Sequence, residues 1–174
     1  MSKRDQMNNF KEARQSMIIR PQKAPFGKRF DPWISSSSPV WQRRAVVQLA
    51  RYLSMETRYR MDLDESVATW RGAGVNAFAI TECIQQNDGN EHEALVGTAI
   101  FYMYSEGPTL YYCYLHPFFR NRKLLQKHWE ELRRRYPEFE IEPPISKPMQ
   151  ALLVRLGYRI TNGQVVRRTD QAPS

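Results

Sequence analysis

Long apolar runs are missing from this sequence, in which no stretch approaches the roughly 20 residues that a membrane-spanning helix requires. Residues 1–9 are polar and charged, and they lack the apolar centre of a signal peptide. Cysteine is scarce, and Cys83 and Cys113 each lie in apolar, strand-like sequence, where a buried free thiol is more common than a disulfide. These absences argue against a membrane protein or a disulfide-rich secreted protein, and we expect a cytoplasmic or phage-associated one.

Metal-ligand spacing and nucleotide-binding loops are also missing. None of the three histidines, His92, His116 and His128, has a cysteine or another histidine at zinc-ligand spacing, so no metal site is expected. The sequence has neither the glycine loop of nucleotide hydrolases nor the dinucleotide-binding fingerprint. Metal-dependent, P-loop and dinucleotide-dependent enzymes are therefore not favoured.

Positive charge is in excess, with a formal net charge of +8, and it is unevenly distributed. Residues 1–44 hold ten Lys or Arg against three acids, and residues 119–135 hold seven against Glu130 and Glu131. Such clusters favour an anionic partner, which is nucleic acid, a phosphate-bearing cofactor or an acidic protein surface. The alternative for residues 119–135 is a helix face that is simply solvated. No membrane partner is expected.

The length of 174 residues predicts one ordinary domain with tails. We interpret residues 1–14 as a basic flexible arm, residues 15–169 as the domain and residues 170–174 as a tail. Several prolines and a run of serines predict an extended loop over residues 21–38. A loop of that length inside a compact domain is often functional.

Hydrophobic periodicity predicts that helices and strands both occur. Ser38 and Pro39 are a typical helix start, and a capping box from Asp62 to Glu65 predicts a second helix. The expected order is a strand at 17–20, helices from 39 and 62, strands at 75–84, 94–104 and 109–115, a helix from about 123, a strand at 139–142, a helix at 148–156 and a closing hairpin at 158–168.

Two segments, YLHPFFRNRKLLQKHWEEL from residue 114 and MQALLVRLGYRI from residue 149, resemble the motifs of the GNAT superfamily of acyl-CoA-dependent N-acetyltransferases. In that family a central strand ends in a Val-x-Pro-x-Tyr-Arg type segment, and a later short helix runs into Gly-Phe. The matching positions here are Leu115, Pro117, Phe119, Arg120, and then Gly157 with Tyr158. The resemblance implies an α+β fold with a mixed, mostly antiparallel central sheet and helices on both faces.

The resemblance also implies where acetyl-CoA or another acyl-CoA binds. In the family, the amino end of the helix after the central strand holds the pyrophosphate, because its unpaired N–H groups and positive dipole end favour phosphate. Lys123 and Leu125 depart from the family pattern, which has small residues there, and Leu153 replaces a general-acid tyrosine. The residues implied in cofactor binding are Leu115, Phe119, Arg120, Asn121, Arg122, Lys123, Leu124 and Leu125.

Three residues are candidates for acid–base catalysis. Glu82 is an acid inside a predicted strand, and Tyr112 and Tyr114 lie on the strand that precedes the motif. The alternatives are a glutamate that points to solvent and tyrosines that serve in packing. Cys113 is not favoured as a nucleophile, because no base is placed beside it with certainty.

The resemblance therefore implies an acyltransferase that moves an acyl group from acyl-CoA to an amine or to a nucleic-acid-borne acceptor. The alternative is a catalytically inactive domain of the same fold that binds nucleic acid or a large protein complex, for example in a phage. The two departures in the motifs favour the inactive domain, and the retained segment around Pro117 and Arg120 favours the enzyme.

Overall fold

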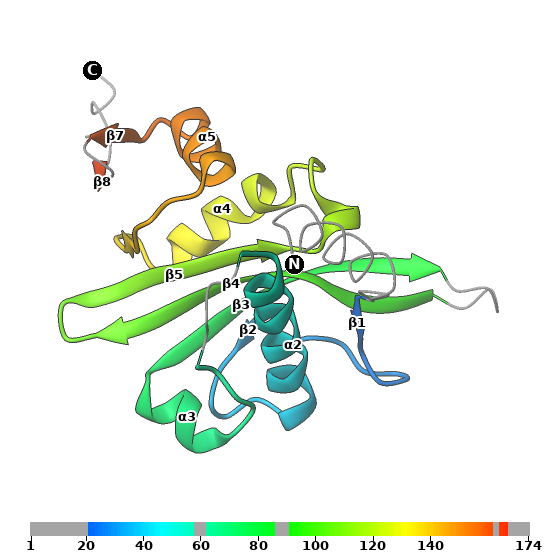
Figure 1. Cartoon of the computed structure of the whole chain (residues 1–174). Helices are drawn as coiled ribbons and strands as arrows, with labels where there is room; N and C mark the ends of the chain where they lie inside the picture. Colours follow the sequence, from blue (N-terminus) through cyan, green and yellow to red (C-terminus); the bar gives the residue numbers. More distant parts are fainter. Residues whose placement is uncertain (1–20, 58–61, 86–90, 162–163, 167–174) are drawn as a thin grey trace, which may run out of the picture.

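A mixed, mostly antiparallel β-sheet forms the centre of the molecule (Figure 1). The computed structural model describes residues 21–57, 62–85, 91–161 and 164–166. The strands are β1 (Gln22–Lys23), β2 (Trp33–Ile34), β3 (Val75–Gln85), β4 (Glu91–Tyr104), β5 (Gly107–Leu115) and β6 (Glu140–Ile141). Their order is β2-β3-β4-β5-β6, and β1 pairs with β4.

Helices cover both faces of this sheet (Figure 1). The helices are α2 (Val40–Thr57), α3 (Val67–Gly72), α4 (Leu124–Arg135) and α5 (Lys147–Arg155), with a 3₁₀ turn η1 (Pro117–Phe119) before α4. A separate two-stranded sheet, β7 (Arg159–Thr161) with β8 (Gln164–Val166), follows α5. The predicted α+β class, with its mostly antiparallel sheet, is confirmed.

Two hydrophobic cores form because side chains alternate between the two faces of each strand. One core joins α2 and α3 to the sheet and includes Val46, Leu49 and Trp70. The other joins α4 and α5 to the opposite face and includes Trp129 and Leu153. The helical periodicities predicted from the sequence correspond to these buried faces.

Two polar residues of α2, Gln42 and Arg43, are buried. Arg43 is 5% exposed, and its guanidinium donates to the carbonyl oxygens of Ser36, Ser38 and Glu65. Buried charges require such partners, because an unpaired guanidinium loses its hydration without compensation. Arg43 therefore ties the loop before α2 to the segment before α3.

Three sequence predictions need correction. The loop at residues 21–38 contributes the two short strands β1 and β2 to the sheet. The reason is that backbone N–H and C=O groups along the edges of the long strands need hydrogen-bond partners. The second helix begins at Val67, with Ser66 as the N-cap, rather than near Asp62. Cys83 is exposed rather than buried. The strand expected at 17–20, the arm at 1–14 and the tail at 170–174 lie outside the described residues.

Candidate functional site

A cleft opens where β5 and β6 diverge. These strands form the parallel pairing of the described sheet, and it spans only two residues of each. The amide of Glu142 then donates to the carbonyl of Leu110 at 3.0 Å, and Pro143 and Pro144 follow. Proline has no N–H group, so it cannot extend the hydrogen-bond ladder. The pairing ends at these prolines while β5 continues to Leu115, so the two segments separate.

A β-bulge in β5 lies at the same place. Ile100 is opposite Tyr112, but the next residue of β4, Phe101, is opposite Leu110, so Tyr111 is an extra residue in β5. A bulge bends its strand and increases the local twist. The bend begins at the last residues that pair with β6, and it therefore contributes to the divergence of the two segments.

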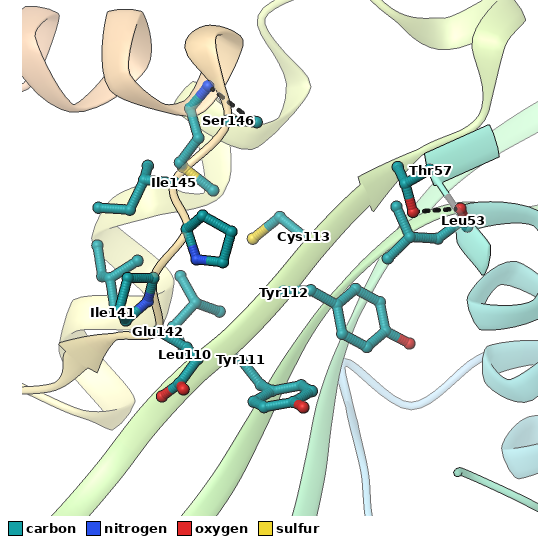
Figure 2. Close-up of a pocket in the computed structure, with 13 residues that line it drawn as sticks. Leu53, Thr57, Leu110, Tyr111, Tyr112, Cys113, Ile141, Glu142, Ile145 and Ser146 are labelled. Carbon is teal, nitrogen blue, oxygen red and sulfur yellow. Dashed lines mark hydrogen bonds between the residues drawn. The ribbon is translucent and has the colours of Figure 1, made fainter. Parts of the chain in front are cut away.

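The space between the diverging segments is a cavity of about 290 Å³. Helix α2 supplies one wall, and the segment from β6 to α5 supplies the other, with β5 between them (Figure 2). Most of the lining side chains are apolar. They are Leu53, Thr57, Leu110, Tyr111, Tyr112, Cys113, Ile141, Glu142, Pro143, Pro144, Ile145, Ser146 and Met149.

Burial favours the neutral forms of two side chains of this lining, Tyr112 and Cys113. Burial, with smaller contributions from Tyr102 and Cys113, raises the pKa of the Tyr112 phenol, and burial raises the pKa of the Cys113 thiol. The Tyr112 hydroxyl is buried and has no hydrogen-bond partner among the described residues. The phenol therefore stays protonated and can donate a hydrogen bond but is a weak acid, and the protonated Cys113 is a poor nucleophile.

The turn before α4 keeps a left-handed backbone without glycine. Asn121 has φ of 63°, and Lys123, the N-cap of α4, has φ of 57° and ψ of 21°. No side chain caps this helix end. Lys123 adopts a conformation that glycine accepts without strain, and position 123 is one of the two at which the resemblance implies a small residue.

Glycine at position 123 is expected to give a more stable protein than alanine at this position, by about 1 kcal/mol. Both variants remove the lysine charge, so the comparison isolates the left-handed backbone, which a Cβ atom disfavours. Urea unfolding of K123G and K123A measures the difference. An alanine variant as stable as the glycine variant would contradict the assigned backbone conformation.

Arg120 connects this turn to α2. Its Nη2 atom lies 2.6 Å from Oε2 of Glu56, and its Nε atom donates to the carbonyl of Leu115 at 2.9 Å. The other carboxylate oxygen of Glu56 accepts from the Tyr114 hydroxyl at 2.9 Å. Burial and this hydrogen bond to Glu56 raise the pKa of Tyr114. Tyr114 is therefore a neutral hydrogen-bond donor to the carboxylate.

The other residues implied by the resemblance lie around this turn and not in the cavity lining. Phe119, Leu124 and Leu125 are buried in the core beneath α4, whereas Asn121, Arg122 and Lys123 are exposed. The Arg122 guanidinium lies 4.8 Å from the centre of the Phe119 ring. Leu115 is partly buried against the same core.

The three catalytic candidates lie in different places. Tyr112 lines the cavity, and Tyr114 is buried against Glu56. Glu82 is partly exposed on β3 opposite Ala94, outside the lining. Leu153, at the position of the family tyrosine, is fully buried in the core. The structure thus brings only Tyr112 to the cleft.

Sequence reasoning missed Glu56, Thr57 and the segment at residues 142–146. The two consecutive prolines after a short strand were a usable signal, because they end a strand ladder. No local sequence pattern indicated Glu56 or Thr57. Their positions depend on how the last turn of α2 packs against β5, which is a tertiary contact.

A second cavity, of about 380 Å³, lies at the other end of β5. The β4–β5 turn, the segment before β6 and the C-terminal hairpin line it, and Glu106, Glu138 and Glu140 are among the lining residues. It does not include the bulge at Tyr111. The first cavity, with its apolar walls and buried phenol, is the better candidate for an organic ligand.

No protein-family model matches the sequence, and no curated protein matches it. None of the described helices is both long and apolar enough to cross a bilayer. Within the described ranges, no three His, Cys, Asp or Glu side chains gather as a set of metal ligands. The candidate site is therefore defined by its geometry alone.

Proposed function

We propose that the protein binds an acyl-CoA in the cleft between β5 and residues 142–146, and that it transfers the acyl group to an amine. The observation that carries this proposal is the separation of β5 from β6, with a cavity of about 290 Å³ between them. A continuous sheet has no room for a pantetheine arm, whereas diverging strands leave room for one. The apolar lining suits an acyl-pantetheine chain, because such a chain is largely uncharged.

The turn before α4 offers a binding place for the diphosphate of the acyl-CoA. Helix N-termini present unpaired N–H groups, and the first turn of α4 has no side-chain cap. Arg122 and Lys123 are exposed beside it, and a guanidinium and an ammonium add favourable charge for phosphate. The left-handed backbone at Lys123 is a shape that glycine, one of the small residues that the resemblance implies at this position, accepts without strain.

An inactive binding module is the second candidate. It is favoured by Leu153, a buried leucine where a proton donor is expected, and by the high pKa of the Tyr112 phenol, which makes it a weak acid. Such a module retains the cleft and the cationic turn but lacks turnover. Nucleic acid is the partner we propose for it, through the exposed cations of residues 119–135.

Acetyl-CoA is expected to raise the Tm of the protein. A ligand that binds only the folded state at 100 times its Kd adds about 2.7 kcal/mol of stability, which corresponds to roughly 5–10 °C for a chain of this size. Differential scanning fluorimetry with 1 mM acetyl-CoA tests this, with ATP as the control for unspecific anion binding. Equal shifts with both compounds, or none, would refute acyl-CoA binding.

Release of free CoA thiol in the presence of amines then separates the two candidates. An acyltransferase produces one thiol for each amide bond that it forms, and a binding module produces none. Binding without thiol release across a panel of primary amines and polyamines would favour the module.

A further inference from the structure

Glu56 holds three elements together at the edge of the candidate site. It lies in the last turn of α2, and its carboxylate accepts hydrogen bonds from Tyr114 on β5 and from Arg120 in the turn before α4. The side chains of Glu56 and Arg120 are 14% and 41% exposed. The next residue, Thr57, lines the cleft. The carboxylate therefore lies against the turn proposed to hold the diphosphate, and Glu56 is the chain neighbour of a residue of the cleft lining.

We propose that Glu56 and the ligand diphosphate compete for Arg120, and that Glu56, once released, binds a protonated amino group of the acceptor other than the neutral amine that attacks the thioester. This inference rests on the proposed function. It assigns to Glu56 the role of an acceptor-binding residue that is available only after the cofactor has bound. Binding is then ordered, with the acyl-CoA first and the amine second.

Arg120 can change partners, but the change has a cost. Its own side chain is 41% exposed, so water can solvate the guanidinium as it leaves, whereas Glu56, which is 14% exposed, loses its charged partner. The Nε bond to the Leu115 carbonyl keeps the side chain close to the turn while the Nη groups move. A diphosphate offers several charged acceptor oxygens, to which a guanidinium binds in a bidentate manner. Arg122 and Lys123, exposed in the same turn, add to this attraction.

Release of Arg120 leaves Glu56 with the Tyr114 hydroxyl as its hydrogen-bond donor. A carboxylate that is mostly buried and has lost its cation is unfavourable until another cation replaces it. A protonated amine at the α2 side of the cleft supplies that charge. The carboxylate therefore selects acceptors that carry a cationic group besides the reacting amine over neutral or anionic ones.

The competition predicts that Glu56→Gln binds acetyl-CoA about three- to fivefold more tightly than the wild type, since Arg120 no longer has an anionic partner to leave. Glu56→Asp keeps the negative charge but its shorter side chain cannot hold Arg120 in the same position, so it should also bind more tightly. Glu130→Gln removes an equal charge from the exposed face of α4 and should leave the affinity unchanged. Isothermal titration calorimetry measures all three.

The variants distinguish competition from general charge repulsion. Tighter binding by E56Q with no change in E56D indicates that only the net charge matters, and it overturns the competition. Wild-type protein that binds acetyl-CoA, together with an E56Q variant of equal affinity, overturns it as well. If the wild type does not bind acetyl-CoA, the proposed function itself fails. Urea unfolding of each variant verifies that it is folded.

The proposed binding of the acceptor by Glu56 is tested by a separate measurement. In acetyl transfer to a diamine, E56Q should raise the KM for the diamine about tenfold while the KM for acetyl-CoA does not rise. This split differs from the result of a general structural defect, which would raise both. An amine KM equal to that of the wild type would overturn the assignment of Glu56 as an acceptor-binding residue.

Discussion

Replacing Trp129 by alanine is expected to lower the free energy of unfolding by roughly 3–5 kcal/mol. Trp129 is 1% exposed in α4, and its ring lies 5.7 Å from the ring of Phe139 and 6.0 Å from that of Tyr158. Its indole nitrogen donates to the Tyr158 hydroxyl at 3.3 Å. Truncation leaves a cavity between α4 and the C-terminal segment and also removes that donor. Thermal and urea unfolding measure the loss.

Two milder variants divide this effect into its parts. Tyr158→Phe removes only the hydrogen-bond acceptor of Trp129 and should cost about 1 kcal/mol. Trp129→Phe keeps an aromatic ring in the core and should lie between Y158F and W129A. If W129A were as stable as Y158F, the indole would contribute only its hydrogen bond, and the packing described for the second core would be wrong.

A tryptophan at position 57 is expected to weaken acetyl-CoA binding by roughly 100-fold, equivalent to about 2.7 kcal/mol. Thr57 lies at the end of α2 and faces the cavity from the side opposite Ile141 and Ile145 (Figure 2). Because the cavity holds only about 290 Å³, an indole that enters it displaces the pantetheine arm. Thr57 is exposed, so the fold should tolerate the change.

Matched variants control for indirect effects of T57W. Arg51→Trp places the same side chain at another exposed position of α2, outside the cavity lining, and should leave the affinity unchanged. Thr57→Ser keeps a small hydroxyl side chain and should also bind normally. Should T57W bind acetyl-CoA as well as T57S does, the cleft between β5 and residues 142–146 would not be the ligand site.

The candidate site was only partly predictable from the sequence. The motif around Pro117 and Arg120 led to the turn before α4, and this turn has the left-handed residue and the uncapped helix end that phosphate binding favours. The same motif did not indicate which carboxylate pairs with Arg120. Its carboxylate partner, Glu56, is 64 residues away in the chain, and no local pattern relates positions so far apart.

The two cysteines show a similar limit. Both lie in apolar, strand-like sequence, yet Cys83 is exposed and Cys113 lines the cavity. Strand periodicity assigns alternate residues to alternate faces, but it does not say which face a helix covers at that point of the strand. The difference between these thiols therefore arises from the placement of helices over the sheet.

By itself, the sequence determined the α+β class and the order of the longer helices and strands, because apolar periodicity acts within a few residues of the chain. The tertiary structure alone decided the cavity beside the bulge and the Glu56–Arg120 pair. Both depend on contacts between elements distant in sequence, whose relative positions are set by the packing of two cores against one sheet.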